Sequence, residues 1–147
     1  MWPFRSKKKA TPIPTIRCDN ISVHWNAQLN WWQFSDGEID YSLARPEFDV
    51  AILNSLVLVR RWLTDLDEEI DAEIKKHLEG WCEWTGEKHV ISVEVLNLVR
   101  QNEIDIAYAG GDNWGDLGVN IVISDGKIIK SYAGAVSYTH LTLPTKA

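Results

Sequence analysis

Two Asp-Gly pairs, each set between two strand-like runs, constrain the fold of this chain more than any other feature of its sequence. An Asp-Gly pair between extended runs is typical of a tight β-hairpin, because glycine readily adopts the positive φ angles that such turns require. The sequence therefore predicts two antiparallel hairpins. Their turns and flanking runs are Asp36-Gly37 between residues 29–34 and 39–43, and Asp125-Gly126 between residues 117–123 and 128–133.

The middle of the chain has helical periodicity. Apolar residues recur at helical spacing over residues 48–63, and further apolar residues cover much of the rest of that surface, which predicts a central, largely buried helix. A second helix is predicted from about residue 65 to Gly80, with a stripe formed by Leu66, Ile70, Ile74 and Leu78. Acidic residues gather at its start, where the positive end of the helix dipole favours them.

The remaining segments are predicted as strands, with one ambiguity. Residues 15–25 and 103–109 alternate between apolar and polar, as half-buried strands do. Residues 90–100 combine strand alternation with a helical cluster of apolar residues, and we predict a helix from about Ser92. The expected fold is α+β: an antiparallel sheet built from two β-hairpins plus flanking strands, packed against two or three helices on one face.

The length of 147 residues fits a single domain, which we place at residues 15–135. Residues 1–14 contain three prolines and three consecutive lysines and are predicted to be a mobile basic arm. Residues 136–145 resemble the translated read-through of a sequencing-library adaptor. We therefore expect residues 136–147 to be a non-native tail that carries no functional information.

The charge is distributed unevenly along the chain. Residues 18–135 contain all 21 acidic residues and 9 of the 15 basic residues, a formal net charge of −12 against −6 for the whole chain. Such an acidic body repels phosphate, which makes nucleic acid an unsuitable partner and a basic protein a suitable one. No apolar run approaches the roughly 20 residues of a transmembrane helix, and no secretory signal is recognisable, so we expect a cytoplasmic protein. Weak contact with a membrane surface is a possible role for Trp2, Phe4, Lys7, Lys8 and Lys9.

The sequence lacks the common catalytic and metal-binding motifs. The histidines are isolated, and Cys18 and Cys82 form no CxxC pattern and are predicted to be free thiols. Asp112 and Asp116 lie in a glycine-rich loop, but the spacing does not match a calcium-binding loop. We therefore expect no cofactor, no metal and no catalytic residue, which favours a protein that is not an enzyme.

Tryptophan is unusually frequent, with eight residues in the chain. Trp31 and Trp32 are adjacent on a predicted strand, so they must face opposite sides of the sheet, and one of them is a candidate for the surface. Exposed tryptophan is common at the centre of protein interfaces. The candidate binding residues are Trp31, Trp32, Asp112, Trp114 and Asp116.

Residues 32–39 and 114–128 resemble small uncharacterised bacterial domains of unknown function, among them immunity proteins that neutralise toxins. The resemblance spans about residues 29–133, rests on turn and strand residues, and implies no catalytic residues. Our leading hypothesis is a non-catalytic, immunity-type module that binds a basic protein through an acidic, tryptophan-bearing surface. Two alternatives remain open: a small hydrolase or ligand-binding protein that uses Asp112, Asp116 and His89, and a membrane-surface adaptor that uses the N-terminal arm.

Overall fold

The computed structural model describes residues 15–18 and 21–135, and their side chains from Ile21 onward. The predicted basic arm (1–14) and the predicted non-native tail (136–147) lie outside the described residues. No helix in the described ranges is long and apolar enough to span a membrane. The elements are β1 (Thr15–Cys18), β2 (Ile21–Asn26), β3 (Trp31–Ser35), β4 (Asp40–Leu43), α1 (Ala51–Asp65), α2 (Asp67–Leu78), β5 (His89–Glu94), α3 (Leu98–Gln101), β6 (Glu103–Ala109), the 3-10 turn η1 (Gly111–Asn113), β7 (Leu117–Ser124) and β8 (Lys127–Ala135).

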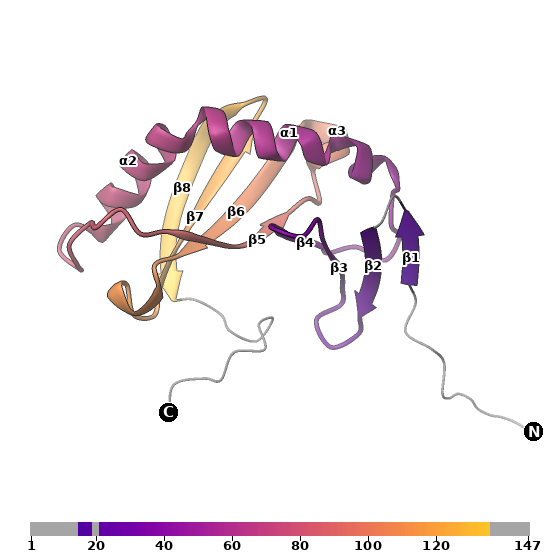
Figure 1. The fold of residues 1–147 in the computed structure, drawn as a ribbon, viewed down its shortest axis with the longest axis horizontal. Coiled ribbons are helices and arrows are strands. Elements are labelled where there is room, and N and C mark those ends of the chain that lie inside the picture. Colours follow the sequence, from indigo (N-terminus) through magenta and orange to yellow (C-terminus); the bar gives the residue numbers. More distant parts are fainter. Residues whose placement is uncertain (1–14, 19–20, 136–147) are drawn as a thin grey trace, which may run out of the picture.

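The described strands form one sheet whose spatial order is their order in the chain, β1 to β8. Every neighbouring pair is antiparallel except β4 and β5, which are parallel. Parallel neighbours need a long crossover connection, and α1 and α2 provide it. Two antiparallel halves, β1–β4 and β5–β8, therefore meet at one parallel seam. Figure 1 shows α1 and α2 along the same side of this sheet, with the two halves splaying apart beneath α1.

The two predicted hairpins are confirmed as β3–β4 and β7–β8. Asp125 and Gly126 both have positive φ angles, 52° and 77°, which suits the right-handed twist of a two-residue turn. The first turn differs, since only Gly37 has a positive φ. The α+β class and the mostly antiparallel sheet are also confirmed, but the sheet has more strands than we predicted and contains the parallel seam.

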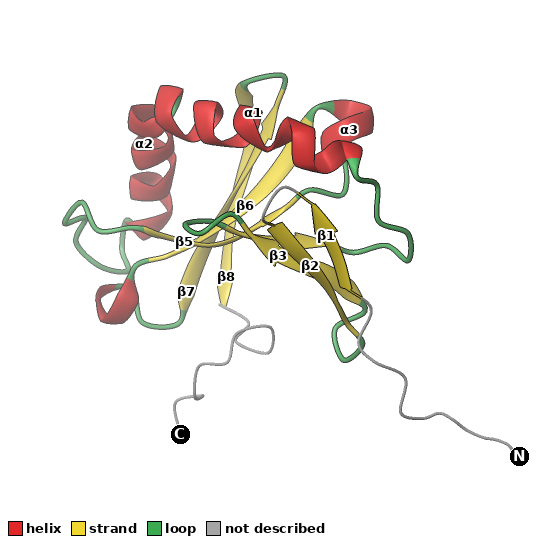
Figure 2. Ribbon diagram, turned by 45° about the vertical axis from the view of Figure 1, so that its right-hand side comes forward, coloured by secondary structure: helices red, strands yellow, loops and turns green. Residues whose placement is uncertain are grey.

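The predicted helix over residues 48–63 is present as α1, although its environment differs from our prediction. Its sheet-facing side is buried, through Ile52, Leu56, Val59 and Trp62. Its outer side faces solvent, where the side chain of Val57 is 60% exposed. The expectation of a largely buried helix was wrong because helices lie on only one face of the sheet, and no second layer covers α1 in the described part of the chain (Figure 2).

The predicted helix from Ser92 is also wrong. Residues 89–94 form strand β5, and the helix is limited to the single turn α3 at residues 98–101. Strand pairing decides the conformation, because β5 completes the seam with β4 on one side and pairs with β6 on the other. Val93 and Val95 are fully buried in that arrangement. The second predicted helix is confirmed as α2, with Asp67, Glu68 and Glu69 in its first turn.

The core lies between the helices and one face of the sheet. Alternate residues of β6 show the pattern: Ile104, Ile106 and Tyr108 are buried under the helices, whereas Glu103, Asp105 and Ala107 face the other way and are only partly buried. The second set belongs to the sheet face on which the structure describes no helix. We call this surface the open face, and the site described below lies on it.

Candidate functional site

Trp114, at the centre of the loop that contains Asp112 and Asp116, has a structural role. Trp114 is completely buried, and its carbonyl oxygen accepts a hydrogen bond of 2.7 Å from Trp81 Nε1. Asn113 Nδ2 donates to the carbonyl of Glu83, which ties this loop to the segment after α2. Asp112 and Asp116 are exposed, and no group of three or more potential metal ligands occurs in the described residues. The structure therefore does not bring these two carboxylates together with Trp114 at one surface.

The histidines considered at the sequence level lie apart from one another. His89 Nε2 lies 2.8 Å from Glu87 Oε2 on an exposed segment. His77 Nε2 lies 2.8 Å from Ser131 Oγ, whose hydroxyl donates to Glu73 and so links α2 to β8. Cys82 is a free, half-buried thiol packed against the core. Glu87 lies against Gly111, next to Asp112, so the pair of His89 and Glu87 is near this loop, whereas His77 pairs with β8.

Trp31 and Trp32 occupy opposite faces of β3, as the alternation of a strand requires. Trp32 is only 7% exposed; its ring packs on Trp25 and Phe48, and its Nε1 donates to the carbonyl of Pro46. Trp31 is half-buried on the open face, where its Nε1 donates to Gln33 Oε1 over 3.3 Å. Trp31 is therefore the member of the pair that lines the hollows of the open face.

The open face is hollowed on both sides of the parallel seam. A hollow of about 530 Å³ lies over β5–β8, and a second of about 450 Å³ lies over β2–β4. Trp31, Ser42, Ile91 and Ser92 line both. The sheet register places one continuous row of neighbouring side chains across this face: His24, Gln33, Ser42, Glu94, Asp105, Val122 and Lys130. Directly opposed residues in such a row have Cβ atoms about 5 Å apart, close enough to act on one ligand.

Glu94 is a partly buried acid on this face. Burial raises the pKa of Glu94, hydrogen bonds from the backbone N–H groups of Ala44 and Leu96 to Oε2 oppose that change, and the charge of Asp105 adds to it. The net result is a pKa above the usual glutamate value. Asp105, directly opposite on β6, is held by two neutral donors: Asn120 Nδ2 at 2.8 Å and the Tyr132 hydroxyl at 2.7 Å.

Tyr132 closes one side of the larger hollow. Burial, together with its hydrogen bond to Asp105, raises the pKa of Tyr132 to about 12, so the hydroxyl stays protonated and donates to the carboxylate at neutral pH. The ring itself is 46% exposed. An aromatic side chain is therefore fixed beside two carboxylates.

Ser42 lies at the centre of the row, beside Glu94 across the parallel seam. Among the described residues it is the one buried residue classed as polar or charged, with 6% of its surface exposed. It lines both hollows. Its hydroxyl has no hydrogen-bond partner among the described residues. The hydroxyl is not one of the fully buried polar atoms that lack a partner, so a polar group in the hollow can reach it and form a hydrogen bond with it.

Sequence reasoning identified Trp31 but missed Ser42, Glu94, Asp105, Asn120 and Tyr132. The alternation of β6 and β7 already assigns Asp105 and Asn120 to a polar face. Their assembly with Glu94 and Ser42 depends on which strands are neighbours, and the local sequence does not encode this. Comparison with protein-family models, with curated proteins and with solved structures found no match to this chain.

Replacing Glu94 by glutamine should stabilise the fold at neutral pH. The folded-state pKa of Glu94 lies above its ordinary value of 4.5, so ionisation costs folding free energy, and stability falls as pH rises from the ordinary value through the folded-state value. Glutamine keeps an acceptor for the N–H groups of Ala44 and Leu96 and removes the repulsion by Asp105. We expect thermal unfolding of E94Q at pH 7 to occur a few degrees higher than for the wild type.

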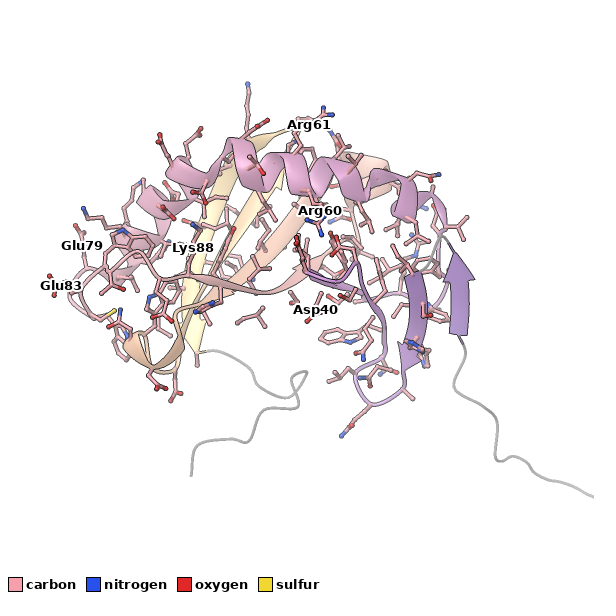
Figure 3. The ribbon with its side chains drawn as sticks, in the orientation of Figure 1. Asp40, Arg60, Arg61, Glu79, Glu83 and Lys88 are labelled. Carbon is pink, nitrogen blue, oxygen red and sulfur yellow. The ribbon has the colours of Figure 1, made fainter. Side chains whose placement is uncertain are left out.

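The pH dependence of the rise in melting temperature of E94Q distinguishes an electrostatic effect from a packing effect. The gain should vanish below pH 4.5, where Glu94 is protonated in both the folded and the unfolded states. Glu83→Gln is a matched control, since Glu83 projects outward from the loop after α2 and should change the melting temperature little (Figure 3). An equal gain from both variants would show that the effect arises from the net charge of the protein.

Proposed function

We propose that this chain is a non-catalytic, cytoplasmic protein-binding module whose open sheet face docks a basic protein partner. One observation carries the proposal: the face opposite the helices bears two adjoining hollows with Trp31 between them and carboxylates within them. Asp40 lines the smaller hollow, and Glu94 and Asp105 line the larger. A tryptophan that anchors a partner, surrounded by charges of one sign, is a common arrangement at protein interfaces.

The charge of the chain supports the same proposal. The net charge of −12 over residues 18–135 favours long-range attraction of a basic protein and speeds its association. Trp32 and Trp114 are buried and cannot anchor a partner, whereas Trp31 lines both hollows of the open face. An immunity-type role, in which the partner is a basic toxin, is the specific form of the proposal that we favour.

A matched pair of double variants tests this function. Proteins captured from the lysate of the source cells by the full chain are compared with those captured by Glu94→Gln/Asp105→Asn and by Glu79→Gln/Glu83→Gln. Both variants remove two negative charges, the first from the open face and the second from the outer loop labelled in Figure 3. We expect a basic partner whose capture by the wild type weakens between low and high salt, since exposed charges are screened over about 10 Å at 0.1 M.

The expected result is loss of this partner from the open-face variant and its retention by the loop variant. A Trp31→Ala variant should also lose it, because a central interface tryptophan commonly contributes 2 kcal/mol or more, roughly thirtyfold in affinity. Equal capture by all variants would contradict docking on the open face. A captured partner that is insensitive to salt would contradict the role of charge.

A further inference from the structure

The larger hollow on the open face contains negative charge that is not paired with a cation among the described residues. Glu94 and Asp105 both line it, and none of its described lining residues is lysine, arginine or histidine. Neither acid forms an ion pair with any described residue. Lys130 lies in the same row, beyond β7, and does not pair with either of them. The charge of the hollow is therefore available to a ligand.

Three partly buried acids on the helix side of the described fold, Asp36, Asp71 and Glu73, have cationic partners. Arg60 binds Asp36, Lys76 binds Glu73, and Lys88 lies within 2.8 Å of both Asp67 and Asp71. Burying a carboxylate without a cation costs free energy, and at these three positions the sequence supplies the cation. Glu94, Glu103 and Asp105 have no such partner among the described residues, and of these three Glu94 and Asp105 line the hollow, where a cation from outside can reach them.

Three further groups give the hollow its chemical selectivity. Trp31 and Tyr132 both line it, and an aromatic ring face attracts a cation that lies against it. Ser42 is more than nine-tenths buried as a residue and adjoins Glu94, and its hydroxyl, which pairs with no described residue, can accept an N–H. Leu29 and Ile91 supply apolar surface for an aliphatic stem. A volume of about 530 Å³ lies within the range of ligand-binding pockets.

We infer that this hollow binds a guanidinium group, the arginine side chain of the docked partner, between the carboxylates of Glu94 and Asp105 and the rings of Trp31 and Tyr132. Guanidinium suits this arrangement better than ammonium, because it is planar, presents several N–H donors to separate acceptors and stacks on aromatic rings. The inference rests on the proposed function and adds to it the chemical group that the partner inserts.

The first experiment measures binding of small probes to the full chain. N-acetyl-arginine N-methylamide is titrated while the indole N–H resonance of Trp31 is followed by NMR. The citrulline analogue, which has the same shape and no charge, serves as the comparison. We expect the arginine probe to bind at least about tenfold more tightly than the citrulline probe, since hydrogen bonds to charged groups contribute 1.5 kcal/mol or more. Equal binding of the two probes would overturn the inference.

Variants then locate the site. Glu94→Gln should lower the affinity for the arginine probe about tenfold. Because we expect this variant to be more stable than the wild type at pH 7, the loss of affinity cannot come from unfolding. Ser42→Ala and Trp31→Ala should each lower the affinity for the arginine probe several-fold. Glu83→Gln removes one negative charge from the outer loop instead and should leave this affinity unchanged. If Glu83→Gln lowered the affinity for the arginine probe as much as Glu94→Gln does, the attraction would come from the net charge of the protein and the inference would be wrong.

The probe and capture experiments fail independently. If the arginine probe binds at Glu94 but the open-face variant captures the partner as well as the wild type does, the guanidinium site is supported and docking of a protein on this face is rejected. Loss of the partner from the open-face variant, combined with no selective binding of the arginine probe, would keep the proposed function and reject guanidinium recognition.

Discussion

Replacement of Trp114 by alanine should lower the free energy of unfolding by about 3–5 kcal/mol, the usual cost of removing a large aromatic side chain from a core. Trp114 has no exposed surface, and its ring packs so closely on Gly110 that a Cβ atom at that position would overlap the indole. A loss of this size is a large share of the 5–15 kcal/mol that typically stabilises a domain. Urea unfolding at pH 7 measures it directly.

Two further variants show that the effect of Trp114 arises from packing. Trp114→Phe should cost much less, because it retains most of the ring volume and removes an indole N–H that has no hydrogen-bond partner in its buried site. Gly110→Ala should destabilise by about 1–3 kcal/mol through overpacking. In contrast, Trp31→Ala on the open face should change stability little and binding strongly. If Trp114→Ala remained as stable as the wild type but lost the partner, Trp114 would be a binding residue.

Local chemistry explains which parts of the fold were predictable. The turns at Asp36-Gly37 and Asp125-Gly126 and the acidic start of α2 are encoded within a few residues, and the hairpins and the helix follow from them. Residues 90–95 carry two overlapping patterns, and the choice between strand and helix is made by β4 and β6, which flank them in the sheet. No local pattern specifies that β4 and β5 pair in parallel.

The candidate site was less predictable than the fold because it depends on long-range pairing. Alternation correctly implied that Trp31 and Trp32 face opposite sides, but the position of the helices decides which of the two is buried. Ser42 and Glu94 are 52 positions apart in the chain and become neighbours only at the parallel seam. Asp112 and Asp116 were predicted as candidate binding residues because they share one glycine-rich loop, but in the structure the central residue of that loop, Trp114, is buried in the core.

Loss of the Asp36 carboxylate should cost about 3 kcal/mol, because this one side chain organises a turn and anchors it to a helix. Oδ1 accepts the backbone N–H groups of Glu38 and Ile39, and Oδ2 accepts the hydroxyl of buried Tyr41. Arg60, reaching down from α1, contacts both oxygens at 3.0 Å. Asp36→Ala leaves the tyrosine hydroxyl without its acceptor and leaves the guanidinium with Glu38 as its remaining partner. An unsatisfied group costs about 1–3 kcal/mol when buried, less where water reaches it.

The pH dependence of Asp36→Asn distinguishes the charge from the turn. Burial raises the pKa of Asp36, but the hydrogen bonds from Ile39, Glu38, Arg60 and Tyr41 outweigh burial and bring it below its ordinary value of 3.8. A lowered folded-state pKa gives stability that is complete above the ordinary value and is lost as pH falls through the folded-state value. The asparagine side chain of the variant keeps an acceptor for the turn and loses only the charge. The free energy of unfolding of the wild type should therefore exceed that of D36N by about 1–2 kcal/mol at pH 7, and this difference should shrink in acid.

Neighbouring arginines on α1 provide the control for this prediction. Figure 3 shows Arg60 pointing toward the β3–β4 hairpin and Arg61 pointing away from the sheet. Arg60→Ala should therefore destabilise the protein while Arg61→Ala does not, and Arg60→Ala combined with Asp36→Asn should cost less than the sum of the two single changes, because both remove one interaction. Additive losses in this cycle would show that Asp36 stabilises the turn independently of the helix, and that the hairpin is not anchored to α1 through this ion pair.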